Sequence, residues 1–323
     1  MATMQPEAQP VPTSSSQNFV FFNARGLRAG WRLIIFLFIC FFLFSAVLLS
    51  MRLLGRQPSP PTSLAASLVI LNDGPTFLLL LLASWIMSRI EKRPMGAYGL
   101  PLRNEPVLSR LVSGYLFWGF IPLTIVLLTL HIFGAFDFGS MALHGAQLWK
   151  SGASWFIAFL LVGLAEEYLL RGYLLYTLGD GIGFWPAAIV LAALFGLGHS
   201  LNPGETRIGL IATVVFALFA SVTLRLTGSL WLAVGAHAGW DWGQSFFYGV
   251  SDSGMTAQGH FLNPSFHATS PVWLNGGTVG PEGSIVTLIL WTLMMVSFYF
   301  LYRKLRESVL GLDTGSSSSP PQI

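Results

Sequence analysis

Long apolar runs, each about the length of a membrane-crossing helix, dominate the chain. A helix rises about 1.5 Å per residue and the hydrocarbon core of a bilayer is about 30 Å thick, so roughly 17 to 25 residues can cross it. Eight such runs occupy residues 31–54, 64–87, 111–133, 154–178, 184–200, 208–224, 229–250 and 285–302. The sequence therefore predicts an all-α polytopic membrane protein with about eight transmembrane helices.

The composition excludes an ordinary soluble domain and a nucleic-acid-binding protein. Of the 323 residues, 53% are hydrophobic and 10% are charged, whereas about a quarter of the residues in soluble domains are charged. The net charge is +3, but the basic residues lie between apolar runs and form no single patch. We expect a lipid bilayer as the surroundings and no nucleic acid as a partner. Cys40 is the only cysteine, so neither a disulfide nor a thiolate metal site is expected.

The distribution of charge predicts the topology. If the eight runs alternate in direction, 13 of the 17 Lys and Arg residues fall on the side that holds both chain ends. Basic residues accumulate on the cytoplasmic side, so both termini are predicted to be cytoplasmic. Polar composition predicts disordered tails at residues 1–24 and 307–323. An integral membrane domain is predicted between them, at residues 25–306.

Two stretches of the chain depart from the apolar pattern. Asn72-Asp73-Gly74-Pro75 lies inside the second run. Pro75 is expected to break or kink the helix, with Asp73 capping its second half. Residues 251–284 are rich in Gly, Pro, Ser and Asn and contain no Lys or Arg. This segment is expected to be an irregular outer loop.

Ionisable residues occur inside the fourth run, where they are costly and therefore suggest function. Glu167 and Arg171 are four residues apart and are expected to form an ion pair on one helix face. Glu166 lies about 100° away around the helix, so the same contact does not neutralise it. Glu166 is the carboxylate left free for chemistry.

Two later runs carry imidazoles. His237 and Asp241 are four residues apart on one face of the seventh run, and His199 lies near the end of the fifth. At 1.5 Å per residue, Glu166 and His237 both lie about 12 Å above the inner surface, whereas His199 comes out roughly 10 Å higher. A tilt or an earlier start of the fifth helix is needed to bring His199 to the others.

Two carboxylates and two imidazoles are suited to activating water, in one of two ways. In the first, Glu166, His199, His237 and Asp241 bind Zn²⁺, which lowers the pKa of a bound water. In the second, no metal takes part: Glu166 is the general base, His199 assists it, and His237 stabilises the developing oxyanion. Both predict hydrolysis of a peptide bond within the membrane.

The three motifs resemble those of a known family. Glu-Glu-x-x-x-Arg (residues 166–171), Phe-x-x-x-His (195–199) and His-x-x-x-Asp (237–241), in this order on separate runs, look like the motifs of the CPBP, or Abi, intramembrane endopeptidases. That group includes the Ras-converting CAAX prenyl protease, and the resemblance covers about residues 150–250. It implies an eight-helix membrane fold and cleavage of a peptide or membrane protein near the membrane face.

The resemblance also implies roles for the motif residues. Glu166 activates water together with His199, within a motif completed by Glu167 and Arg171. His237 and Asp241 bind the oxyanion or a metal. Eukaryotic prenyl proteases carry Asn where this chain has Asp241, and an ionised Asp cannot donate a hydrogen bond to an oxyanion. Asp241 is therefore expected to orient His237, bind metal or be protonated.

The spacers and basic loops look bacterial, which predicts the inner membrane as the location. Prokaryotic members of the family are a mixed set tied to bacteriocin processing or self-immunity, so prenyl-CAAX cleavage does not follow from the resemblance. Two other classes of function also fit intramembrane Glu, His and Asp. One is an ion-coupled transporter that uses them as a proton relay. The other is a non-catalytic bacteriocin-immunity or scaffold protein.

Overall fold

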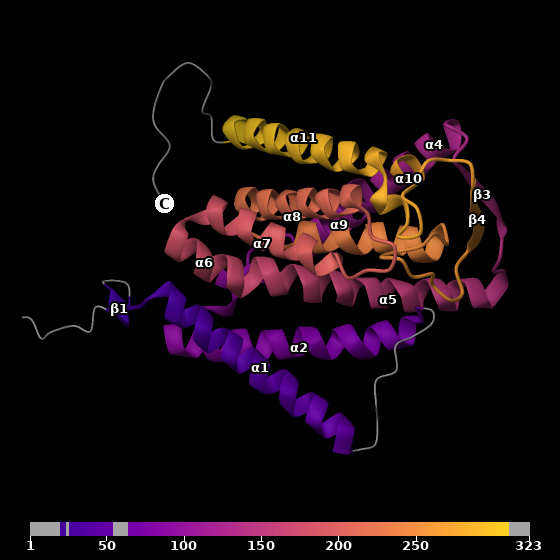
Figure 1. Ribbon diagram of the computed structural model, residues 1–323. Helices are drawn as coiled ribbons and strands as arrows, with labels where there is room; N and C mark the ends of the chain where they lie inside the picture. Colours follow the sequence, from indigo (N-terminus) through magenta and orange to yellow (C-terminus); the bar gives the residue numbers. More distant parts are fainter. Residues whose placement is uncertain (1–19, 24–25, 54–63, 310–323) are drawn as a thin grey trace, which may run out of the picture.

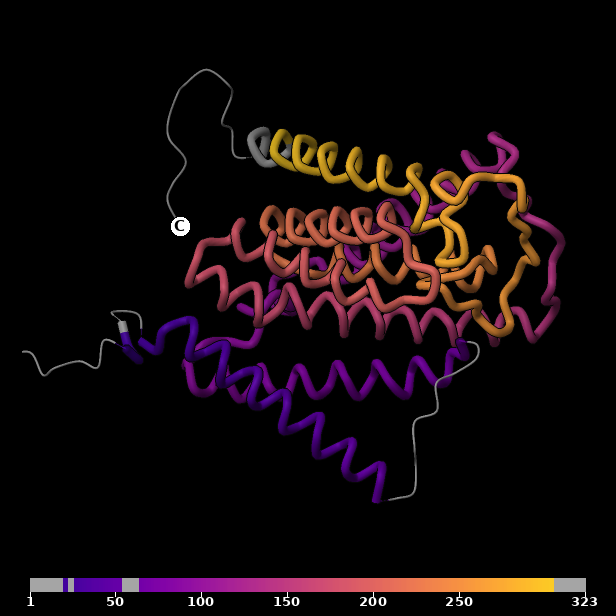
Figure 2. Tube along the Cα trace, viewed as in Figure 1, coloured from indigo at the N-terminus to yellow at the C-terminus, as the bar shows by residue number. Residues whose placement is uncertain are grey.

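The computed structural model describes residues 20–23, 26–53 and 64–309. Within these residues the chain is a bundle of helices that lie side by side (Figure 1). The first residues of α1 (Ala29–Leu53) and the last residues of α11 (Ile285–Val309) lie at the same end of the bundle. Figure 2 shows that α1 lies against α2 (Ala66–Glu91) near its beginning and diverges from it toward its end.

Every apolar run predicted to cross the membrane corresponds to helical structure. After α1 and α2 come α3 (Val107–Ser113), a π-helical stretch (Gly114–Phe120) and α4 (Ile121–Ile132), which together form the third run. The fourth run is α5 (Gly145–Leu169), a second π-helical stretch (Leu170–Leu174) and α6 (Leu175–Ile182). Then follow α7 (Phe184–His199), α8 (Arg207–Thr227), α9 (Trp231–Asp241) with a third π-helical stretch (Trp242–Phe247), and α11.

The fold class is confirmed as all-α and polytopic. Among the described residues, six helical stretches are long and apolar enough to cross a membrane, and α7 is a shorter apolar helix. The six are Ala29–Leu53, Ala66–Glu91, Val107–Ile132, Gly145–Ile182, Arg207–Thr227 and Ile285–Lys304. In contrast, every residue of α9 after Trp231 is buried inside the protein. The count of eight spans and the cytoplasmic side of the termini remain predictions.

The expected break in the second run, with Asp73 as a helix cap, was wrong. α2 continues through Pro75, and Asp73 lies inside it without capping a helix; the residue before the helix is Ala65, which makes no side-chain cap bond. A proline inside a membrane helix is tolerated when side chains satisfy the freed carbonyls. Thr76 Oγ1 donates to the Asn72 carbonyl (2.7 Å), the neighbour of the Leu71 carbonyl that Pro75 leaves without its helical donor.

The predicted tails lie mostly outside the described residues, which do not cover 1–19 and 310–323. Two short stretches that the prediction assigned to the tails have regular structure. Strand β1 (Phe22–Asn23) pairs with β2 (Gly26–Leu27) in an antiparallel ladder. At the other end, residues 307–309 continue α11.

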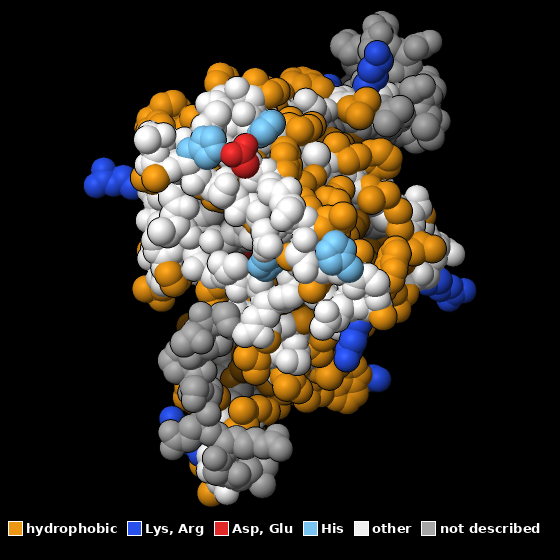
Figure 3. Space-filling model, turned by 90° about the vertical axis from the view of Figure 1, so that its right-hand side faces the viewer, with side chains coloured by type: hydrophobic (Ala, Val, Ile, Leu, Met, Phe, Trp, Pro, Cys, Tyr) orange, Lys and Arg blue, Asp and Glu red, His pale blue; other side chains and the backbone are white. Residues whose placement is uncertain are grey.

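The predicted outer loop is irregular only in part. It contains strand β4 (Leu262–Phe266), which pairs antiparallel with β3 (Phe136–Met141), and the short helices α10 (Val272–Asn275) and Pro281–Gly283. Asp137 on β3 lies 2.7 Å from His267 and 3.4 Å from His131. This ion pairing lowers the pKa of Asp137 and raises the pKa of His267. Figure 3 shows that this face carries few charged side chains besides its histidines.

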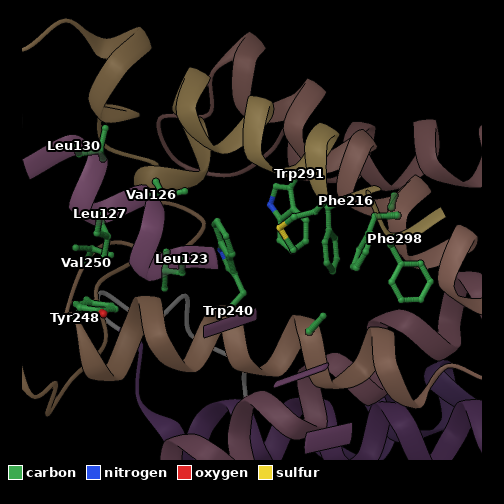
Figure 4. Packing of buried hydrophobic residues seen from close by; sticks show 14 of the residues in the cluster. Leu123, Val126, Leu127, Leu130, Phe216, Trp240, Tyr248, Val250, Trp291 and Phe298 are labelled. Carbon is green, nitrogen blue, oxygen red and sulfur yellow. The ribbon is translucent and has the colours of Figure 1, made fainter. Parts of the chain in front are cut away.

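Glycines let α9 approach its neighbour backbone to backbone. A Cβ at Gly235 or Gly239 of α9 would clash with the carbonyls of Leu111 and Tyr115, and a Cβ at Gly119 would lie 2.8 Å from the Trp240 nitrogen. Aromatic and aliphatic side chains fill the space beside this contact, with Phe216, Trp240 and Trp291 grouped together (Figure 4). The packing therefore fixes α9, which carries two of the predicted site residues.

We expect Gly119→Ala to destabilise the protein, because its methyl group must push the third run away from α9. Overpacking of this kind costs about 1–3 kcal/mol. Gly30→Ala is the matched control, since a Cβ at Gly30 of α1 meets nothing within 4 Å. Thermal unfolding in detergent measures both variants. Equal melting temperatures for the two would contradict the close packing.

Candidate active site

The end of α5 presents two adjacent carboxylates in different directions. Glu167 is fully buried, whereas the Glu166 side chain is 37% exposed and lines a cavity. Neighbouring residues on a helix are about 100° apart, which explains the difference. The π-helical stretch Leu170–Leu174 follows directly, with Gly172 in a non-helical conformation (φ −78°, ψ −118°). The regular helix thus ends just beyond the two carboxylates.

Glu167 holds two cationic or hydrogen-bonding partners inside the protein. Its carboxylate lies 3.4 Å from Arg171 Nη1, which confirms the predicted ion pair. Its Oε1 also lies 2.9 Å from His237 Nδ1, a contact that the sequence did not predict. Arg171 stacks over the Phe195 ring at 4.7 Å. Glu167 therefore connects the first motif to the third, and Arg171 connects it to the second.

His237 turns its second nitrogen toward the other two carboxylates. Nε2 lies 3.4 Å from Asp241 Oδ2, so the predicted pairing of these residues on one helix face is confirmed. The same atom lies 3.7 Å from Glu166 Oε2. The edge-on Phe216 ring packs beside the imidazole, with 5.1 Å between ring centroids. With Nδ1 held by Glu167, Nε2 is the atom available at the cavity.

His199 lines the same cavity as Glu166, His237 and Asp241. Its Nδ1 is hydrogen-bonded to the Phe195 carbonyl (2.9 Å), and its ring packs on the Phe195 ring. The sequence placed His199 roughly 10 Å higher in the membrane than Glu166 and His237. This was wrong because the fourth run does not end at residue 178. It continues to Ile182 and turns at Gly183. Measured along the helices from that turn, Glu166 and His199 lie at similar heights, about 24 Å and 22 Å.

The cavity has a volume of about 1240 Å³ and two unlike walls. An apolar wall comes from the diverging half of α1 and from α2, and includes Phe44, Val47, Leu48, Met51 and Leu68. The polar wall holds the four site residues named above. The cavity lining also includes three carboxyl groups that the sequence prediction had not assigned to the site, those of Asp73 on α2 and of Asp252 and Glu282.

Asp252 and Glu282 come from the outer loop, where no sequence motif marks them. Asp252 Oδ2 accepts a hydrogen bond from Ser245 Oγ (2.8 Å), and Glu282 Oε1 accepts one from the Ser253 backbone N–H (2.8 Å). Burial and the nearby carboxyl groups raise the pKa of Asp252 and of Glu282. Only the folded loop brings these groups to the cavity.

The donor atoms as placed do not fit a resident metal ion. Within the described residues, no group of three or more His, Cys, Asp or Glu side chains is arranged to hold one. The Nδ1 bonds of His237 to Glu167 and of His199 to a backbone carbonyl leave Nε2 of each ring free, so the spacing of the donor atoms, and not the ring orientation, is what does not fit. Zinc binding by Glu166, His199, His237 and Asp241 remains a prediction.

Comparison with known families matches the part of the chain that carries this site. Residues 147–243 match the family model of type II CAAX prenyl endopeptidases, described as Rce1-like. No curated protein matches the chain. The matched segment runs from α5 to the π-helical stretch after α9 and contains all three motifs. This segment, and with it the candidate site, belongs to the CPBP family of CAAX-type intramembrane proteases.

Proposed function

We propose that the protein hydrolyses a peptide bond near the membrane face, with Glu166 as the base that activates the attacking water. The observation that carries this proposal is the contrast between the two adjacent carboxylates. Glu167 is buried and bound by Arg171 and His237, whereas Glu166 reaches the cavity beside His237 Nε2. We place the protein in the inner membrane of a bacterium as part of the same proposal.

The reaction starts with a water held between Glu166 and the substrate carbonyl. Glu166 takes a proton as the water oxygen attacks the carbonyl carbon, a role in which a positioned base contributes about 10²–10⁴-fold. His237, when it carries a proton on Nε2, donates that proton in a hydrogen bond to the oxyanion. Glu166 then returns its proton to the leaving amine, and the C–N bond breaks. His199, on the same cavity wall, assists the water.

The buried residues orient the reacting ones. Glu167 fixes the His237 ring by accepting from Nδ1, so that Nε2 faces the cavity. Such a hydrogen bond determines which ring nitrogen is free for chemistry. Asp241 lies beside Nε2 and favours the protonated ring. When a substrate carbonyl enters, its oxygen takes the position next to Nε2 and the Asp241 contact gives way.

Glu166→Gln is expected to reduce cleavage by about 10²–10⁴-fold, because the amide cannot take a proton from water. The matched control is Asp137→Asn, the same change from acid to amide on the outer face. The assay is hydrolysis of a library of single-span and prenylated peptides by the full chain in proteoliposomes, read by mass spectrometry.

Retained cleavage in the Glu166→Gln protein would overturn the proposal. Proton-dependent uptake that is lost in this variant, with no peptide cleaved by the native chain, would favour a transporter. Full biological activity of the variant would favour an immunity or scaffold protein.

Arg171→Gln is expected to destabilise the protein by about 3–5 kcal/mol, since it leaves the buried Glu167 charge without its cationic partner. Arg171 is 1% exposed. Arg225→Gln is the control, because Arg225 is exposed and stacks over Phe184. The double variant Glu167→Gln/Arg171→Gln should recover part of the lost stability. Thermal unfolding of the three variants in detergent measures this, and a loss no greater than that of Arg225→Gln would contradict it.

The metal content of the purified protein distinguishes activation of water by zinc from activation without a metal. We expect the detergent-purified protein to contain much less than one zinc ion per chain, because the side chains as placed form no three-ligand group within the described residues. Elemental mass spectrometry of the native chain and of His237→Ala measures this. Zinc near one ion per chain that disappears in His237→Ala would instead establish a metalloprotease.

A further inference from the structure

A second pocket lies at the opposite end of α2 from the outer loop and is lined by cations. It has a volume of about 540 Å³, and its lining residues are Trp85, Ser88, Arg89, Lys92, Arg93, Pro94 and Met95. Three of these seven residues are basic and none is acidic. Ligand-binding pockets commonly measure about 300–1,000 Å³. The pocket therefore has the size and charge of an anion site.

Two of the three cations are free to meet an anion. Arg89 and Lys92 are exposed and make no ion pair with a described residue; Arg89 lies over the Trp85 ring at 5.3 Å. Arg93 lies over the Tyr176 ring at 5.3 Å, its ion-pair contacts with Glu91 (3.7 Å) and Asp180 (3.9 Å) are long, and its side chain is 35% exposed. The end of a helix carries about half a negative charge. Three positive charges exceed it, so the field in the pocket attracts anions.

The position of the pocket selects the kind of anion. It lies where α2, a membrane-crossing helix, ends at Glu91, on the side that the basic residues predict to be cytoplasmic. Trp85 is 46% exposed on the last turns of α2, and tryptophans at this depth lie among the lipid headgroups. Basic pockets of this kind on the cytoplasmic side of membrane proteins bind anionic headgroups.

We propose that Arg89, Lys92 and Arg93 bind the phosphate of an anionic phospholipid headgroup. Arg93 also faces a buried cluster that ties three helices together. In that cluster Arg32 of α1 contacts Glu91 of α2 (2.7 Å) and Asp180 of α6 (2.9 Å). A lipid bound at the pocket therefore adds a ligand at the inner end of α1 and α2, the two helices whose outer halves form the apolar wall of the cavity.

The test measures lipid retained by the full chain. The protein is equilibrated in nanodiscs with equal amounts of phosphatidylglycerol and phosphatidylcholine, and bound lipid is counted by native mass spectrometry. Each basic residue near the surface changes the affinity about fivefold. We expect Arg89→Gln/Lys92→Gln to lose about 25-fold in affinity for phosphatidylglycerol. Neither residue belongs to the buried cluster, so this variant should fold.

The matched control is Arg103→Gln/Lys304→Gln, which removes two exposed charges from the same side of the protein. It should retain phosphatidylglycerol like the native chain. Equal retention by Arg89→Gln/Lys92→Gln and the native chain would overturn the proposal, and so would an equal loss in the control. Displacement of the lipid by millimolar inorganic phosphate would show a free-phosphate site and would also overturn it.

Discussion

The buried carboxylate of Glu167 is the interaction on which the site depends. A charge without exposure to water costs several kcal/mol unless partners surround it. Here Arg171 and His237 supply those partners from the same helix and from α9. Because Glu167 takes both contacts, Glu166 is left to face the cavity. Glu167 holds the His237 ring in place, and Glu166 is left free to react at the cavity.

The Glu167–His237 contact requires α5 and α9 to lie close together, and small residues make this possible. A Cβ at Gly163 of α5 would lie 2.9 Å from the Val234 carbonyl of α9. On the opposite side, Gly235 and Gly239 lie against the third run. Small residues at helix interfaces in membranes allow this close approach. α9 is thus held between two helices, which explains how a buried helix can present His237 and Asp241 at fixed positions.

The sequence predicted what local spacing controls. The apolar runs predicted the helices, and the four-residue spacing predicted the pairs Glu167–Arg171 and His237–Asp241. The sequence did not predict contacts that depend on how the helices pack. The Glu167–His237 hydrogen bond joins residues 70 positions apart, and Asp252 and Glu282 reach the cavity from a loop without a motif. The strands β3 and β4 were missed because their pairing joins distant segments. The height of His199 was missed because the fourth run continues for about one more helical turn, to Ile182, beyond its apolar part.

The lining of the cavity bears on which peptides it can hold. Among the described residues, five carboxyl groups line it, and no Lys or Arg does. A peptide that is cut close to its own C-terminus would bring a free carboxylate into this cavity, where no Lys or Arg would pair with it. The lining carboxyl groups that are ionised would repel this carboxylate, because like charges repel strongly at low dielectric. An internal segment of a membrane protein brings no such charge, and its apolar side chains match the wall formed by α1 and α2. The lining of the cavity therefore suits an uncharged, apolar segment better than a segment that ends in a free carboxylate.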